Sequence, residues 1–331
     1  MVNQRMQWMD FVRGICILLV IFLHASGVTQ DVGLSFSPAF VTFNMFMDPF
    51  RIPLLMFLSG MLLHKSLSKA TGDYIRGKLH LIFWPFLLWS MLTYAAENRL
   101  TLEYILKTPI SAPSVLWYLW FLCAFYILSL FLVRARVPLI PVIVVCILAS
   151  GVLPSVLRID RFSALFAFFL LGHVVTSRSL SSKVPTLMAL AGLVAAVTGG
   201  IISVTMGSIK YDPVFVWVPL GLIALILWGS AFYKSVSLTV PFEWIGRNSI
   251  VFYAIHFPAL VVSARLASRS ETVSNGNIFY VLLFAWVVAL GIVVQMLRSR
   301  YTIVAGLFDF RQILKLGQGR FRPPLQTPPR Q

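Results

Sequence analysis

Long apolar runs, separated by short polar segments, recur along almost the whole chain. Each run is about long enough to cross the roughly 30 Å hydrocarbon core of a bilayer as a helix. We therefore predict an all-α polytopic membrane protein with about ten transmembrane helices. The predicted spans are 10–28, 40–64, 79–96, 114–133, 137–153, 162–177, 185–205, 214–233, 245–263 and 278–297.

Charged residues gather between these runs and in the C-terminal segment. Only 11% of the 331 residues are charged, whereas a soluble domain carries roughly twice that fraction. If the N-terminus lies inside, most of the 27 lysines and arginines fall on the cytoplasmic side, as the positive-inside rule requires. Both termini are therefore predicted to be cytoplasmic, in a multi-pass protein of the inner or plasma membrane. The net charge of +16 then indicates contact with anionic membrane lipid and not with nucleic acid.

Two regions are predicted: an integral membrane domain, 1–297, and a basic, proline-rich cytoplasmic tail, 298–331. The tail contains FDFRQILKLG, which can form a short amphipathic helix on the inner leaflet. It ends in RPPLQTPPRQ, which is predicted to be disordered because its prolines cannot continue a helix. The segment near 97–113 contains TPISAP and is predicted to be a turn-rich loop. The three cysteines lie in apolar runs without CxxC spacing, so we predict neither a metal site nor a disulfide.

Three ionisable residues, Asp10, Arg13 and His24, belong to the first predicted span. Eleven helical steps of about 100° bring His24 to within roughly 20° of the direction of Arg13, and Asp10 precedes Arg13 by three residues. The three side chains therefore share one stripe, along which Arg13 and His24 are about 16 Å apart. Ionisable groups are costly in hydrocarbon and by default indicate function. The alternative is that Arg13 reaches lipid phosphate and His24 packs at the far interface.

The second span contains DPFRIP, in which Pro49 and Pro53 flank Arg51. Proline breaks or kinks a helix and frees backbone carbonyls, which is costly in lipid unless another group bonds them. Arg51 is therefore predicted to face a polar cavity and to pair with Asp48, three residues earlier. A purely structural Asp48–Arg51 pair is the alternative.

The ninth span begins with IGRNSIVFYAIH. Ser249, Tyr253 and His256 are spaced by four and three residues, so they share one helix face. Arg247 and Asn248 are predicted to lie at its cytoplasmic entrance. Ser249 and His256 could equally be ordinary packed residues. The chain has no GxSxG, HExxH, P-loop or GxGxxG motif, so the sites typical of those motifs are not expected.

Four short motifs follow one another along residues 8–258. They are a D-x-x-RG…H helix, an FR-x-P…SG segment, a WYL segment and a late IG-x-NS…Y-x-x-H segment, carried by Asp10, Arg13, Gly14, His24, Phe50, Arg51, Pro53, Ser59, Gly60, Trp117, Tyr118, Leu119, Gly246, Asn248, Ser249, Tyr253 and His256. In these motifs the chain resembles acyltransferase family 3, the membrane O-acyltransferases of nodulation-factor and polysaccharide type. That family often carries R-x-x-R before a proline at the third span. Here Lys78 and Leu81 take those positions, with Arg76 and His80 nearby.

The resemblance implies transfer of an acyl group, most often acetyl, from cytosolic acyl-CoA to a hydroxyl of a cell-envelope glycan or glycolipid. Acyl-CoA is then the donor substrate, and no cofactor is bound permanently. Its phosphates favour a cationic cytoplasmic mouth, for which the candidates are Arg13, Arg76, Lys78 and Arg247. The pantetheine arm is long enough to extend along the first helix from this mouth to His24.

Within this family, His24 is expected to act as general base on the acceptor hydroxyl or to take the acyl group transiently itself. Arg51 is expected to stabilise the oxyanion or position the acceptor, and Asp10 to hold Arg13. The expected substrate-binding residues are Trp117, Tyr118, Asn248, Ser249, Tyr253 and His256.

Other functions fit parts of the sequence. One is a glycolipid or anion transporter or flippase that uses Arg13 and Arg51 as anion sites. Another is a non-enzymatic assembly subunit of the membrane. A different class of membrane acyltransferase also uses an intramembrane histidine, but its members usually set it in a late loop or span. The acceptor, the acyl chain and homo-oligomer formation are left open.

Overall fold

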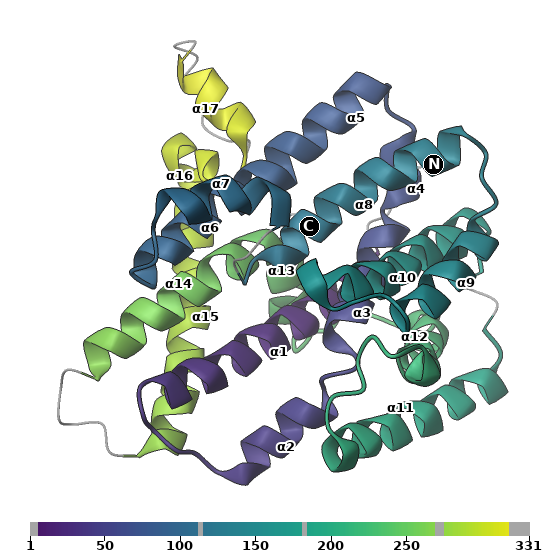
Figure 1. Ribbon diagram of the computed structural model, residues 1–331, viewed down its shortest axis with the longest axis horizontal. Helices are drawn as coiled ribbons and strands as arrows, with labels where there is room; N and C mark the ends of the chain where they lie inside the picture. Colours follow the sequence, from purple (N-terminus) through teal and green to yellow (C-terminus); the bar gives the residue numbers. More distant parts are fainter. Residues whose placement is uncertain (1–5, 112–114, 181–183, 269–274, 318–331) are drawn as a thin grey trace. The chain divides into compact units, whose positions relative to one another are not determined.

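The computed structural model describes residues 6–111, 115–180, 184–268 and 275–317, and this part of the chain is helical without any β-strand (Figure 1). Its helices form two compact units, each built from separate stretches of sequence. Unit 1 takes the chain up to Leu23, together with Ser37–Ala70 and Ala124–Arg247. Unit 2 takes His24–Phe36, Thr71–Cys123 and the chain from Asn248 onward.

Two helices, α1 (Gln7–Asp31) and α8 (Trp117–Arg134), contribute to both units. The other helices of unit 1 are α2 (Pro38–Phe46), α3 (Arg51–Met61), α4 (Leu63–Leu67), α9 (Leu139–Ser150), α10 (Ile159–Ser177), α11 (Thr186–Met206), α12 (Trp217–Ser230) and α13 (Val240–Arg247), with 3-10 turns at Val156–Arg158 and Pro213–Phe215. Those of unit 2 are α5 (Thr71–Lys78), the π-helical turn Leu79–Phe83, α6 (Trp84–Ala96), α7 (Leu102–Ser111), α14 (Ser249–Ala267), α15 (Gly276–Arg300), α16 (Thr302–Gly306) and α17 (Phe310–Gly317).

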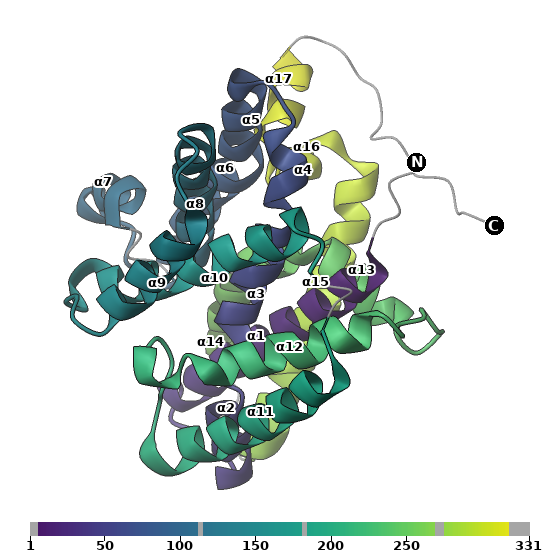
Figure 2. The same cartoon turned by 90° about the vertical axis from the view of Figure 1, so that its right-hand side faces the viewer.

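Glycines set how closely the helices of unit 1 approach one another. In the α3–α10 pair, a Cβ added to Gly60 would lie 1.8 Å from the carbonyl oxygen of Phe169, and one added to Gly172 would lie 2.0 Å from that of Phe57. Such backbone contact is how small residues drive helix association in membranes. Figure 2 shows α11 and α12 side by side, a pair that packs in the same manner.

The same principle explains two glycines of the sequence motifs. A Cβ on Gly14 of α1 would come within 2.0 Å of the Phe242 carbonyl oxygen, and one on Gly246 of α13 within 1.8 Å of the Asp10 carbonyl oxygen. Helices α1 and α13 therefore touch backbone to backbone. Gly14 and Gly246 are needed for packing, not for chemistry.

In unit 2, α14 lies beside α15 (Figure 1) and also packs against α6. The segment after α15 returns to this bundle. The indole nitrogens of Trp84 and Trp89 donate to the carbonyl oxygens of Gly306 (2.9 Å) and Leu307 (3.2 Å). Phe308 is fully buried in a core cluster with residues of α14.

Nine helical segments within the described ranges are long and apolar enough to cross a membrane. They are Gln7–Asp31, Pro38–Leu67, Thr71–Ala96, Trp117–Arg134, Ile159–Ser177, Thr186–Met206, Pro213–Ser230, Ser249–Ala267 and Gly276–Arg300. They confirm the all-α polytopic prediction. The remaining predicted span, 137–153, contains α9, whose 12 residues rise only about 18 Å because Pro138 precedes it and Gly151 follows. The cytoplasmic placement of both termini stays a prediction.

Two local predictions meet different outcomes. The turn-rich loop predicted near 97–113 is wrong, because Leu102–Ser111 forms α7. The sequence LEYILK favours a helix, with a Glu103–Lys107 ion pair of 2.5 Å one turn apart, and Pro109 falls only in the last turn. A helix in FDFRQILKLG is confirmed as α17, whereas RPPLQTPPRQ lies outside the described residues.

Candidate active site

Two histidines from distant parts of the sequence meet in unit 2. The rings of His24, on α1, and His256, on α14, have centroids 5.2 Å apart. Phe257 completes the contact from the other side, with its ring centroid 5.5 Å from that of His24. His24 is half-buried, whereas His256 is fully buried. One imidazole is therefore accessible and is backed by a second that solvent does not reach.

The hydrogen bonding of His256 fixes its tautomer. Its Nδ1 lies 2.6 Å from the carbonyl oxygen of Tyr253, and a carbonyl oxygen can only accept, so Nδ1 carries the hydrogen. A neutral imidazole then leaves Nε2 as an acceptor. Within the described part of the chain this buried Nε2 has no hydrogen-bond partner. A buried polar atom without a protein partner is uncommon and calls for an explanation.

An aromatic cluster continues from the histidines to the WYL motif. The Tyr253 ring lies 5.3 Å from that of His256 and 5.2 Å from that of Tyr118. The Tyr253 hydroxyl donates to the carbonyl oxygen of Val115 at 3.3 Å. Both tyrosines are buried. The first, third and fourth sequence motifs therefore converge on one cluster.

The remaining expected substrate-binding residues belong to the two helices, α8 and α14, that carry this cluster. Trp117 packs on Phe121 of its own helix, with ring centroids 5.0 Å apart. Asn248 occupies the N-cap position of α14 without a side-chain capping bond, and Ser249 is the first residue of that helix, one turn before Tyr253. The predicted common face of α14 is confirmed for Tyr253 and His256, which are in ring contact.

The second motif forms a different kind of site, in unit 1. Helix α2 ends at Phe46 and α3 begins at Arg51, so the predicted break around Pro49 is confirmed. Arg51 is only 2% exposed, and its guanidinium donates to the Asn44 carbonyl oxygen (2.6 Å) and side-chain oxygen (3.2 Å). It also forms the predicted ion pair with Asp48, at 3.3 Å. Arg51 thus bonds backbone freed by the helix break.

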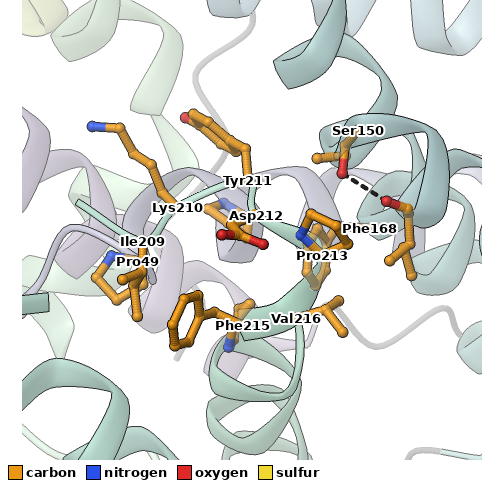
Figure 3. A pocket seen from close by; sticks show the side chains of 14 residues that line it. Pro49, Ser150, Phe168, Ile209, Lys210, Tyr211, Asp212, Pro213, Phe215 and Val216 are labelled. Carbon is orange, nitrogen blue, oxygen red and sulfur yellow. Dashed lines mark hydrogen bonds between the residues drawn. The ribbon is translucent and has the colours of Figure 1, made fainter. Parts of the chain in front are cut away.

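Asp48 is held by two further groups. Lys210 Nζ lies 2.8 Å from its Oδ1, and the Ser208 hydroxyl donates to Oδ2 at 2.6 Å. Beside this cluster, the residues around Lys210 and Tyr211 line a cavity of about 20 Å³ (Figure 3). Such a space has room for about one water molecule. These contacts favour the structural alternative for the Asp48–Arg51 pair.

Helix α1 is continuous from Gln7 to Asp31, which confirms that one helix carries Asp10, Arg13 and His24. Asp10 is buried and Arg13 is half-buried, and both belong to unit 1. The Arg13 guanidinium donates to the carbonyl oxygen of Leu58 at 3.4 Å. His24 is the first residue of the same helix that belongs to unit 2.

The four cations expected to bind acyl-CoA divide between the units, with Arg13 and Arg247 in unit 1 and Arg76 and Lys78 in unit 2. Arg247 and Arg76 are exposed. The Lys78 ammonium lies 5.3 Å from the centre of the Tyr74 ring. The π-helical turn that follows Lys78 is a form often found at functional sites. In the described residues no group of three or more His, Cys, Asp or Glu side chains is arranged to hold a metal ion.

Comparison with known proteins identifies a family over most of the chain. The family described as "Acyltransferase domain" matches residues 6–296. The chain belongs to acyltransferase family 3. Its family points to an acyltransferase activity, and its apolar helices to a multi-pass membrane protein.

One relative from curated proteins is the inner membrane protein YcfT of Escherichia coli (strain K12). It is 22% identical, and the match covers 77% of this chain and 79% of the relative. No solved structure matches the chain.

Proposed function

We propose that this membrane acyltransferase moves an acyl group, most simply acetyl, from cytosolic acyl-CoA to a hydroxyl of a cell-envelope glycan or glycolipid, at the inner or plasma membrane. The observation that carries the proposal is the contact between the accessible imidazole of His24 and the buried imidazole of His256. Histidine is the side chain most often used to move a proton near neutral pH. Family membership supplies the class of reaction.

In the proposed step His24 is the general base. The acceptor hydroxyl oxygen bonds to the thioester carbonyl carbon as its proton passes to the His24 imidazole. The tetrahedral intermediate then breaks its C–S bond, and the coenzyme A sulfur leaves as the thiol by taking that proton. The products are the ester and free coenzyme A, and His24 returns to its neutral form.

His256 is proposed as a positioning residue. Its Nδ1 is committed to the Tyr253 carbonyl oxygen, so its free Nε2 lone pair can only accept a hydrogen bond. An acceptor next to His24 favours the tautomer and the imidazolium that the base must adopt, as a carboxylate does in catalytic triads. Tyr253 and Tyr118 hold this ring in place.

The donor is proposed to enter from the cytoplasmic end of α1. Arg13 and His24 are eleven residues apart on one continuous helix, a rise of about 16 Å. This length suits an extended pantetheine arm whose phosphates remain with cations at the mouth. Asp10 would then support Arg13, and Arg76, Lys78 and Arg247 are the further candidates for the phosphates.

For Arg51 we propose a structural role in place of the expected oxyanion role. Its guanidinium is engaged with Asn44 and Asp48 within a buried cluster. We propose that it maintains the break between α2 and α3 and through it the shape of unit 1.

A deletion strain tests the proposed function. Its glycolipids and cell-wall glycans are compared by mass spectrometry with those of the parent and of strains complemented with wild type or His24→Ala. We expect an acyl group to be lost in the deletion, restored by wild type and not restored by His24→Ala at equal membrane abundance. If the deletion strain retains every acyl group of the parent, the enzyme proposal is wrong. Acylation restored by His24→Ala, with transport reduced, would favour a transporter.

A further inference from the structure

A cavity of about 330 Å³ opens in unit 2 beside the histidine pair. This volume lies in the range of roughly 300–1,000 Å³ that is usual for small-ligand sites. The walls come from the C-terminal ends of α1 and α14 and from the turn that follows α6. The ends of these three helices therefore come together at one place in unit 2.

The wall residues of α1 and α14 follow the same spacing. From α1 they are Val28, Asp31 and Val32, which are four, seven and eight residues after His24. From α14 they are Phe257, Val261, Ala264 and Arg265. Residues at this spacing share one helix face, so the cavity wall continues the face that carries His24. It extends roughly 6–12 Å beyond that residue along the helix. Phe257 belongs both to the cavity and to the histidine contact.

The turn after α6 is built so that two charged side chains are held at the cavity. Asn98 adopts a left-handed conformation (φ 59°), and the Arg99 amide donates to the Tyr94 carbonyl oxygen at 2.8 Å. This is a Schellman-type helix end, which asparagine tolerates. The guanidinium of Arg265 donates to the carbonyl oxygens of Ala96 and Glu97, which lie at the end of the helix. The backbone that carries Glu97 and Arg99 is thereby held at the cavity.

The charges at the cavity balance. Asp31 and Glu97 line it together with Arg99 and Arg265, so the ionised lining has no net charge. Burial raises the pKa of the half-buried Glu97 carboxyl. The nearby Arg99 and Arg265 lower this pKa and Asp31 raises it, and the net effect is an increase. A balanced rim with an apolar wall suits a neutral polyhydroxylated ligand better than an anion. Sugar hydroxyls donate to carboxylates and accept from guanidinium groups, while the sugar's C–H faces pack on aromatic and aliphatic side chains.

We infer that this cavity binds a neutral sugar unit of the acceptor and presents one of its hydroxyls to His24. The inference rests on the proposed function, which it deepens by naming the acceptor subsite and its chemical class. Glu97 and Arg99 are substrate-binding residues in this account, and Phe257 joins the sugar site to the histidine pair.

The test measures binding without turnover. The full-length Val32→Cys protein in lipid nanodiscs is treated with a small water-soluble maleimide, and labelling at position 32 is read by peptide mass spectrometry, separately from the native cysteines. The probes are the methyl glycosides of glucose, galactose and mannose. Methyl glucuronide and inorganic phosphate serve as anionic probes. We expect at least one neutral glycoside to slow labelling.

Arg99→Gln and Lys107→Gln, each added to Val32→Cys, form the matched pair. Both remove one cation, but Lys107 lies on the exposed face of α7 in an ion pair with Glu103. Arg99→Gln loses a charged hydrogen-bond donor. We therefore expect this variant to need about ten times more glycoside for the same protection from labelling. Lys107→Gln should protect like the parent.

Absence of protection by every neutral glycoside would overturn the inference, as would protection by the anions alone. Equal protection in Arg99→Gln and Lys107→Gln would overturn it as well. These results are independent of acyl transfer, which the His24 strains report. Protection without any acyl transfer would instead show a sugar-binding membrane protein and defeat the proposed function alone.

Discussion

Two polar sites lie within the apolar helices, and they differ in how their polar atoms are bonded. In unit 1 the Arg51 guanidinium bonds the two oxygens of Asn44, and the Asp48 carboxylate bonds Lys210 and Ser208. The adjoining cavity holds about 20 Å³. In unit 2 the buried Nε2 of His256 has no partner among the described residues, and the cavity nearby holds about 330 Å³. The first site has bonded polar groups and little space beside them, whereas the second combines a larger cavity with a buried nitrogen that has no described partner.

This difference separates charges that maintain a fold from groups that carry out chemistry. A buried ion is tolerable when its hydrogen bonds are complete, and removing one partner then destabilises the fold. A catalytic base must instead keep a nitrogen available for the proton that it takes. We therefore propose that the chemistry belongs to the histidine pair, with the half-buried His24 as its accessible member, and that Arg51 has the structural role, although both belong to the motifs of the family.

The largest effect on stability is expected at Arg51. Arg51→Ala removes a buried guanidinium that bonds both oxygens of Asn44 and pairs with Asp48, which keeps Lys210 as its other cation. Breaking this buried network should lower the free energy of unfolding by about 3–5 kcal/mol. The measurement is the thermal unfolding midpoint of purified protein in nanodiscs. If Arg51→Ala unfolds like wild type while acyl transfer is lost, the comparison between the two sites is broken and the oxyanion role is restored.

The second largest effect on stability is expected at Gly246. In Gly246→Ala the new Cβ would lie 1.8 Å from the Asp10 carbonyl oxygen, so α13 must move away from α1. Overpacking of this kind costs about 1–3 kcal/mol. The control is Gly229→Ala in the same unit, where an added Cβ meets nothing within 4 Å. An unfolding midpoint that is equally unchanged in both variants would show that α1 and α13 are not in backbone contact.

His256 sharpens the account of the second site. His256→Phe keeps the ring volume but removes the acceptor nitrogen, and loss of orientation at His24 should lower the acyl-transfer rate about 10- to 100-fold. The pH profile of the rate should shift as well, which a packing role alone would not produce. His256→Gln, which returns an acceptor, should recover part of the rate. A wild-type rate and pH profile in His256→Phe would contradict a positioning role.

The smallest effect is expected on the surface of α7. Lys107→Gln breaks an ion pair with Glu103 whose side chains are 60% and 67% exposed. Exposed pairs contribute little because water screens them. We expect an unchanged unfolding midpoint and an unchanged acyl-transfer rate. A clear loss of either would mean that α7 contacts a substrate or a second copy of the chain.

Features repeated locally along the chain could be predicted from sequence. These features are nine spans, the break around Pro49, the Asp48–Arg51 pair and the common face of Tyr253 and His256, and each depends on one continuous stretch of sequence. Helical periodicity and proline chemistry suffice for such features. The short α9 shows the limit of prediction from hydropathy. The predicted span was 137–153, but the helix itself is bounded by Pro138 and Gly151 and is shorter.

Contacts between distant segments were not predictable in this way. The meeting of His24 with His256 and the backbone contact of Gly14 with α13 depend on which helices pair, and one sequence carries no such signal. Arg99 and Arg265 follow the third and ninth predicted spans, where the positive-inside rule expects few cations. Their departure from the positive-inside pattern was the available signal that they serve another purpose.

The rate of acetyl transfer per mole of folded protein, measured for wild type and His24→Ala in nanodiscs with labelled acetyl-CoA and extracted envelope glycolipid, tests the central claim most directly. The account predicts a loss of roughly 10²- to 10⁴-fold with an unchanged unfolding midpoint. Label that stays on wild-type protein given acetyl-CoA alone would indicate an acyl-histidine route through the same residue. A wild-type rate in His24→Ala would contradict the account.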